Sequence, residues 1–214
     1  MADLNVADQP PAVTAAREAL TSEFSGLFDG GTVSRFVADS YERLTARPHD
    51  DQTLVEATER LARQRLQALA RVEAKRPDDR PIVLFMCVHN AGRSQMALGW
   101  FQRLAGDAAI AWSGGSEPGS AVNPAAVAAM AEVGIDIARE FPKPWTDEIV
   151  RAADVVVTMG CGDACPFFPG TRYEDWALDD PHGQGIDAVR PIRDEIERRV
   201  RALLAALGVV TSSH

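Results

Sequence analysis

A short loop between an apolar run and an amphipathic helix is the feature that most constrains how this chain can fold. The apolar, β-favouring residues 82–86 lead into a loop that contains Gly92. Apolar residues then recur at the spacing of a helix face, at Ala97, Trp100, Phe101 and Leu104. A loop between a strand and a helix N-terminus presents free backbone N–H groups and the positive end of the helix dipole. The sequence therefore predicts an anion-binding site here.

Two side chains of this loop suit chemistry on a tetrahedral oxyanion. Cys87 directly follows the predicted strand, and Arg93 follows six residues later. A thiol at a helix N-terminus is stabilised as the nucleophilic thiolate. A guanidinium is a planar, bidentate donor for phosphate or arsenate. We interpret Cys87 as a nucleophile and Arg93 as an anion clamp, over the alternative of a core thiol and a solvated helix residue.

Overall charge and composition restrict the partners. The net charge of −9 argues against nucleic acid or an anionic membrane as the main partner, so an oxyanion must be attracted by a local positive site. No apolar run approaches the length of a membrane span, and the first residues lack the features of a signal peptide. Three cysteines do not make a disulfide framework, and we expect a cytoplasmic protein with reduced thiols.

The chain divides into two regions that differ in their predicted secondary structure. Residues 1–79 are predicted to form a small all-α domain with helices at about 11–29, 32–46 and 51–76, followed by a charged linker bracketed by prolines. In residues 80–214, strands alternate with helices, which indicates an α/β domain with a parallel sheet covered by helices on both faces. Ligands bind such sheets at the carboxyl ends of strands, where Cys87 lies.

The elements predicted in the second region follow from apolar patterns and capping residues. Strands are expected at 82–86, about 108–113 and 154–159. Helices are expected at about 94–105, from a cap at Asn123 to Gly134, at about 146–152, and in a last segment that ends at Gly208.

A second thiol pair follows the third predicted strand. Cys161 and Cys165 stand between glycines and Pro166, and parallel strands would bring Cys161 near Cys87. This placement favours a thiol relay, in which Cys161 attacks an adduct on Cys87 and Cys165 then takes over the disulfide. Two alternatives are buried structural thiols and half of a zinc site that recruits His182, although the usual zinc spacings are missing. We expect no metal centre.

Asp180 and His89 are further candidates for the site. Asp180 could act as the general acid that protonates a departing oxygen, but Asp-Asp-Pro at 179–181 is equally typical of a simple turn. His89 could donate to a bound anion or could pack within the loop.

These residues together resemble the thioredoxin-coupled arsenate reductases built on the low-molecular-weight protein tyrosine phosphatase fold. The resemblance covers about residues 81–207 and implies a parallel four-stranded sheet. Five blocks in the expected order carry it: residues 87–97, Ser113-Gly114-Gly115 with Glu117-Pro118-Gly119, Val122-Asn123-Pro124, Val157-Thr158-Met159 before the cysteine pair, and Trp176 with Asp179-Asp180-Pro181.

The resemblance implies a role for each of these positions. Cys87 would attack arsenate, Asp180 would assist the leaving oxygen, and Cys161 and then Cys165 would resolve the adduct. Thioredoxin would be the external reductant, with no cofactor in the protein itself. The loop would hold the oxyanion. Within it, Asn90 would shape the backbone and Ser94 would donate a hydrogen bond to the thiolate. The residues of this loop are Val88, His89, Asn90, Ala91, Gly92, Arg93 and Ser94.

The chain departs from that family pattern in three places. Its distal cysteines are closer together than in better-known members, so the segment between them must be shortened. Leu98 stands where potassium-binding members carry a glutamate, so we expect no potassium site. The N-terminal helices have no counterpart in the minimal fold, although some actinobacterial versions carry a similar three-helix extension. Their amphipathic pattern is typical of a stabilising module or of a homodimer contact.

Three other functions compete with this prediction. A tyrosine phosphatase would use Cys87, Arg93 and Asp180, but it would usually show aromatic residues after the Asp-Pro, and none occurs at 182–185. A mycothiol-dependent arsenate reductase would not need Cys161 and Cys165. In a non-enzymatic reading, the N-terminal helices bind a partner and the anion pocket is inert.

Overall fold

The computed structural model describes residues 10–45, 51–75, 78–160 and 166–211. These residues belong to two compact units, and the division falls after Asp78, one residue before the predicted boundary. Among the described residues, every helix is too short or too polar to cross a lipid bilayer.

The first unit consists of three helices, α1 (Pro11–Glu23), α2 (Gly30–Thr45) and α3 (Asp51–Val72), which pack against one another. Their shared core is apolar and includes Leu20, Phe24 and Leu66, each at most 1% exposed. The prediction that the first helix reaches residue 29 was wrong, because the chain turns after Glu23 and Gly26 adopts a positive φ of 83°. The predicted three-helix region is confirmed.

The second unit is built on a parallel four-stranded sheet, as the family resemblance implies. Its strands are β1 (Ile82–Cys87), β2 (Ile110–Gly115), β3 (Val155–Met159) and β4 (Arg172–Asp175), in the order β2-β1-β3-β4. β1 is central and buried along its whole length, as its continuous apolar sequence requires. β4 does not follow from the residue pattern, because it is a four-residue edge strand of polar and aromatic residues.

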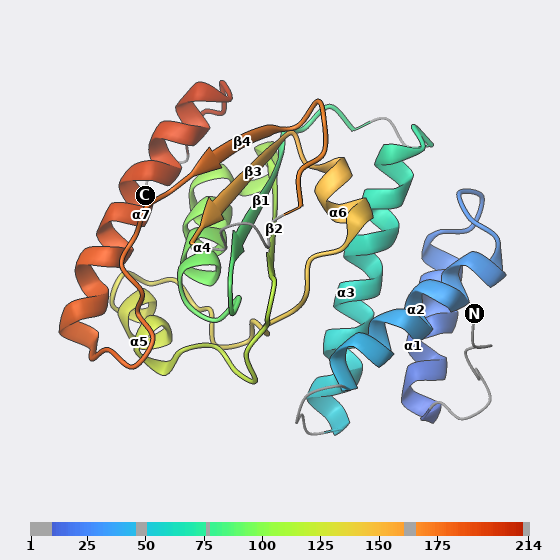
Figure 1. The fold of residues 1–214 in the computed structure, drawn as a ribbon. Coiled ribbons are helices and arrows are strands. Elements are labelled where there is room, and N and C mark those ends of the chain that lie inside the picture. Colours follow the sequence, from blue (N-terminus) through green and yellow to red (C-terminus); the bar gives the residue numbers. More distant parts are fainter. Residues whose placement is uncertain (1–9, 46–50, 76–77, 161–165, 212–214) are drawn as a thin grey trace. The chain divides into compact units, whose positions relative to one another are not determined.

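Helices cover both faces of this sheet (Figure 1). On one face, α4 (Arg93–Ala105), α5 (Pro124–Glu132) and α7 (Ile186–Ala206) share a core with Val83, Phe85 and Val157. The short helix α6 (Asp147–Ala152) contacts β1 from the other side. A short 3₁₀ turn, η2 (Gly106–Ala108), links α4 to β2 and delays that strand by two residues relative to the prediction.

The register of the strands brings three residues to one edge of the sheet. Cys87 pairs with Gly115 of β2 on one side and with Met159 of β3 on the other. All three strands are parallel, so their carboxyl ends open toward the same side. The thiol of Cys87 therefore lies at the edge where ligands bind in such folds.

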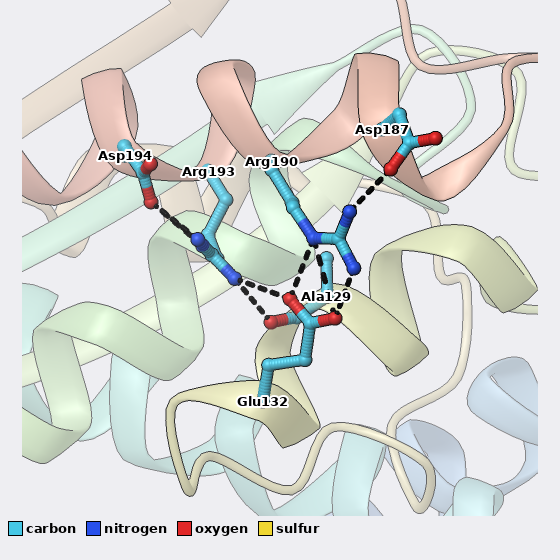
Figure 2. A network of polar contacts seen from close by, with 6 residues as sticks. All are labelled: Ala129, Glu132, Asp187, Arg190, Arg193 and Asp194. Atoms are coloured by element: carbon cyan, nitrogen blue, oxygen red, sulfur yellow. Dashed lines mark hydrogen bonds and ion pairs between the residues drawn. The ribbon is translucent and has the colours of Figure 1, made fainter.

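A group of charged side chains joins α5 to α7 (Figure 2). The Glu132 carboxylate accepts hydrogen bonds from Arg190 Nε at 2.9 Å and Nη2 at 2.6 Å, and from Arg193 Nη1 at 3.1 Å. Arg193 is 8% exposed and also donates to the carbonyl of Ala129 at 2.8 Å. These bonds, led by those from Arg190, lower the pKa of Glu132 from 4.5 to about 2.

We predict that this contact stabilises the fold at neutral pH and loses its effect in acid. The pKa of Glu132 is lower in the folded state, so its stabilisation is present above pH 4.5 and is lost as the pH falls toward about 2. Glu132→Gln should lower Tm at pH 7 by a few degrees, and the difference should shrink between pH 4.5 and pH 2. Calorimetric unfolding scans across this range would measure it.

Asp187→Asn is the matched control. Asp187 also contacts Arg190, but its side chain is 91% exposed, and exposed ion pairs contribute little. An equal loss of Tm in both variants would show that Glu132 has no special role.

Candidate active site

The loop after β1 is bonded to its neighbours through its backbone carbonyl groups. The carbonyl oxygens of Val88, His89 and Ala91 point outward and accept hydrogen bonds from Glu117, Gly119 and Asn123 at 2.8–2.9 Å. In a trans peptide the N–H points away from the C=O, so the N–H groups of the residues that follow turn toward the inside of the loop. With the N-terminus of α4, they form a cradle for an anion.

Glycines allow the neighbouring segments to approach this loop. A Cβ atom at Gly115 would lie 2.6 Å from the carbonyl oxygen of Val88, and one at Gly92 would lie 2.7 Å from Pro181 Cγ. Neither contact is sterically allowed. The loop is thus packed between the end of β2 and the segment after β4, and its shape depends on these two glycines.

A chain of hydrogen bonds leads to the thiol. Cys87 is 3% exposed, and its Sγ lies 3.0 Å from Ser94 Oγ. Ser94 Oγ in turn accepts a hydrogen bond from Asn90 Nδ2 at 2.8 Å. Since that lone pair of Ser94 is occupied, its hydroxyl hydrogen is free to point at Cys87 and to stabilise a thiolate.

Asn90 is held in a backbone conformation that non-glycine residues rarely adopt, with φ at +46°. Its Oδ1 accepts hydrogen bonds from the backbone N–H of Lys143 at 3.0 Å and from Gln95 Nε2 at 3.2 Å. Gln95 Nε2 also lies 3.0 Å from the Asn90 carbonyl oxygen. These contacts fix the asparagine from both sides.

Arg93 reaches across the carboxyl end of the sheet. It is 8% exposed, and its Nη1 donates to the carbonyl of Leu178 at 3.3 Å. Its Nη2 lies 3.3 Å from Asp180 Oδ2. A Cβ atom at Gly160 would be 3.1 Å from Arg93 Nη1, so this glycine leaves room for the guanidinium.

Asp180 forms a turn and also contacts the guanidinium of Arg93. Its Oδ1 accepts a hydrogen bond from the backbone N–H of His182 at 3.1 Å, as an Asx turn requires. Its side chain is 54% exposed, and its other oxygen faces Arg93. The two interpretations of the Asp-Asp-Pro sequence are therefore compatible.

His89 lies at the surface, with Nδ1 3.1 Å from the carbonyl oxygen of Glu117 and its ring 5.9 Å from that of His182.

These groups surround a pocket of ≈ 670 Å³. Cys87 and Arg93 line its floor, and Asp180 stands beside them. The rest of the wall comes from the loop after β1 (His89, Ala91 and Gly92), from residues 119–125 between β2 and the start of α5, and from residues 181–184 after β4. No aromatic ring other than the two imidazoles lines it among the described residues.

Cys161 and Cys165 lie outside the described residues, and so does most of the zinc alternative that combines them with His182. The register places Met159, two residues before Cys161, beside Cys87. No structural role in the site was predicted from the sequence for Gln95 or Lys143. Nor was it predicted that Asn123 supports the pocket wall, where its Nδ2 donates a hydrogen bond to the Pro181 carbonyl at 2.9 Å.

Comparison with known proteins assigns the family. The family model described as low molecular weight phosphotyrosine protein phosphatase matches residues 82–211. A second model, described as the N-terminal domain of protein-tyrosine-phosphatase-like proteins, matches residues 14–70. The chain belongs to the low-molecular-weight phosphatase family. The family resemblance seen in the loop and its flanking motifs is thereby confirmed.

Several similar members of this family are arsenate reductases. Arsenate reductase 2 of Staphylococcus epidermidis is 39% identical over 128 residues, which cover 58% of this chain and 96% of that protein. The thioredoxin-dependent arsenate reductase of Corynebacterium glutamicum has a solved structure that is 38% identical, with a TM-score of 0.81 over 92% of this chain and 96% of its own. The Erwinia amylovora tyrosine phosphatase, at 18% identity and a TM-score of 0.53, shares the fold alone, over 58% of this chain and 91% of its own.

We predict that removing the Ser94 hydroxyl slows the reaction of Cys87 with electrophiles. Ser94→Ala deletes the donor to the thiolate, and a hydrogen bond to a charged group contributes about 1.5–3 kcal/mol. Alkylation of Cys87 by iodoacetamide at pH 7 should therefore slow by about tenfold or more. The rate would be measured by mass spectrometry, with Cys161 and Cys165 both changed to serine.

Ser113→Ala is the matched control for this experiment. Ser113 is 1% exposed on β2, and its Oγ has no hydrogen-bond partner among the described residues. An alkylation rate that falls equally in both variants would point to a general loosening of the fold instead of a role for Ser94.

Proposed function

We propose that this protein reduces arsenate to arsenite, with Cys87 as the nucleophile and thioredoxin as the final reductant. The observation that carries the proposal is the cradle around Cys87, which combines inward N–H groups, the hydroxyl of Ser94 and the guanidinium of Arg93. It lies in a chain whose similar relatives are named arsenate reductases.

The first step uses the part of the site that the structure describes. The Cys87 thiolate attacks the arsenic atom of arsenate, whose oxygens are bound by the loop N–H groups and Arg93. One oxygen leaves as water after it takes a proton from Asp180, which stands beside the guanidinium. The product is a covalent Cys87–arsenic(V) adduct.

The later steps transfer two electrons from thiols to arsenic. The Cys161 thiolate attacks Cys87 Sγ, the sulfur–arsenic bond breaks, and its electron pair stays on arsenic, which leaves as arsenite. Cys165 then attacks Cys161, which releases the Cys87 thiolate and leaves a Cys161–Cys165 disulfide. A thioredoxin dithiol reduces that disulfide. The support for this relay is the order of the cysteines in the sequence and the sequence position of Cys161, two residues after the last residue of β3.

A phosphatase is the second candidate, because the family model carries that activity in its description. The pocket gives it less support, since His182, Gly183 and Gln184 line the wall where an aromatic ring of a substrate would need a stacking partner.

We propose that the protein works in a reducing compartment such as the cytoplasm, as its relay requires. A homodimer through the N-terminal helices stays a prediction.

Steady-state turnover tests the relay directly. With thioredoxin, thioredoxin reductase and NADPH, we expect the wild type to reduce arsenate and both Cys161→Ser and Cys165→Ser to lose turnover, because each thiol is needed once per cycle. NADPH oxidation would be followed by absorbance. Full activity of Cys165→Ser, or turnover with mycothiol alone, would contradict the internal relay. Brisk hydrolysis of p-nitrophenyl phosphate without arsenate reduction would favour the phosphatase.

Asp180 is expected to act on the chemical step more than on binding. Asp180→Asn keeps the size and the turn-forming oxygen but cannot deliver a proton, so kcat for arsenate should fall by about 10²-fold or more. Asp179→Asn, one residue earlier at an equally exposed position, should leave kcat nearly unchanged. Similar rates for the two variants would remove Asp180 from the mechanism.

A further inference from the structure

Two imidazole rings stand at the wall of the anion pocket, and the proposed reaction uses neither side chain. His89 comes from the loop after β1 and His182 from the segment after β4, and both line the pocket. Their ring centres are 5.9 Å apart, and the ring planes are tilted by 50°. Both residues are exposed, so a solute that enters the pocket from solution can reach the rings.

Ring nitrogens of this pair are available to a ligand. His89 Nδ1 lies 3.1 Å from the carbonyl oxygen of Glu117, and because a carbonyl only accepts, this nitrogen carries a hydrogen. The contact holds the ring and leaves Nε2 without a hydrogen bond to the described residues. The His182 ring touches the His89 ring and forms no hydrogen bond to the described part of the chain, while its backbone N–H donates to Asp180 at 3.1 Å.

The other charges of the pocket do not add up to a cationic site. Among the described residues that line it, the ionisable side chains are those of Cys87, His89, Arg93, Asp180 and His182. The Asp180 carboxylate lies 3.3 Å from the guanidinium of Arg93 and offsets its charge, and a thiolate at Cys87 adds a further negative charge. Besides the partial charges of the loop N–H groups, only the two imidazoles can then supply positive charge to a dianion in this part of the structure.

A dianion would couple its own binding to the protonation of these rings. Imidazoles gain or lose a proton between about pH 5 and pH 8, and two of them side by side resist carrying two positive charges at once. A dianion held next to the pair compensates that repulsion. By linkage, the anion then draws protons onto the rings, and protonated rings bind the anion more tightly.

We propose that His89 and His182 form a protonatable rim that binds the incoming oxyanion and takes up a proton with it. As imidazolium donors they attract a dianion to a chain whose net charge is −9, while the chemical step stays at Cys87. The inference rests on the proposed function in one respect, that this pocket binds a tetrahedral oxyanion.

Sulfate binding at low ionic strength is the first test, because sulfate stays a dianion over the range in which imidazoles titrate. It would be titrated calorimetrically into the full chain in which Cys87, Cys161 and Cys165 are serine. Between about pH 5.5 and pH 8 the affinity should fall about tenfold, the scale of one unit charge acting on a dianion near the surface. Near pH 7, roughly half a proton should be taken up per sulfate, as measured in buffers of different ionisation enthalpy.

Two substitutions of His182 separate its charge from its shape. His182→Gln removes the charge and should weaken sulfate binding several-fold at pH 6, with a smaller proton uptake. His182→Arg keeps a positive charge at every pH, so it should bind sulfate more tightly than the parent at pH 8, also with a smaller uptake. A ring that merely fills space predicts weaker binding in both variants. Gln184→Ala, from the same wall, is the control and should leave the proton uptake unchanged.

His89→Gln should likewise reduce the uptake, and thermal unfolding would confirm that each variant is folded. If His89→Gln does not fold, the two His182 variants still decide, because the His182 ring has no hydrogen bond to lose among the described residues.

Each outcome bears on the inference. A parent protein whose sulfate affinity does not change with pH would overturn it, and so would full proton uptake in both His182 variants. Uptake that is lost in Asp180→Asn and kept in the histidine variants would assign the proton to the carboxylate and would also overturn it. Absence of sulfate binding in the parent would overturn both the anion site and the rim. If sulfate binds as expected but the wild type reduces no arsenate, the inference stands and the proposed function fails.

Discussion

The hydrogen bonds of the Asn90 side chain are the interactions on which the site depends. It joins Ser94 on α4, the backbone of Lys143 beside β2 and the amide of Gln95, while its own backbone keeps a positive φ of 46°. A left-handed conformation costs free energy for most residues with a Cβ atom, and less for asparagine, whose short polar side chain can form local hydrogen bonds. Here those contacts turn the loop N–H groups inward and the Ser94 hydroxyl toward Cys87. The strain and the anion cradle are two aspects of one arrangement.

In an acidic protein, a site proposed to bind an oxyanion needs a local cation that offsets the overall field. The Arg93 guanidinium is held at low exposure, 8%, whereas Asp180 is 54% exposed at its side chain. Charges shielded from water interact more strongly than charges at the surface. The buried guanidinium of Arg93 is therefore a strong local positive charge at the pocket, although the net charge of the chain is −9.

The sequence predicts those parts of the molecule that local patterns determine. The strand before Cys87, the loop and α4 follow from an apolar run, a glycine and a helical repeat, so Cys87, Arg93 and Ser94 could be named. β4 could not, because Arg172–Asp175 lacks an apolar pattern and forms a strand only by pairing with β3. Lys143 gave no signal either, since a lysine between two prolines reads as exposed loop. Its burial arises from tertiary contacts that no local rule contains.

The helical scaffold and the pocket share a residue, which makes their stabilities interdependent. Asn123 caps α5 through Oδ1, at 2.8 Å from the N–H of Ala125, and binds the carbonyl of Pro181 through Nδ2. At the other end of α5, Glu132 binds α7 through Arg190 and Arg193 (Figure 2). Pro181 in turn presses against Gly92 of the anion loop. A continuous series of contacts thus runs from α7 through α5 and the cap at Asn123 to the wall beside Asp180. The polar contacts of α5 thus bind both the pocket wall, through Asn123, and the helix α7, through Glu132, although Glu132 does not line the pocket.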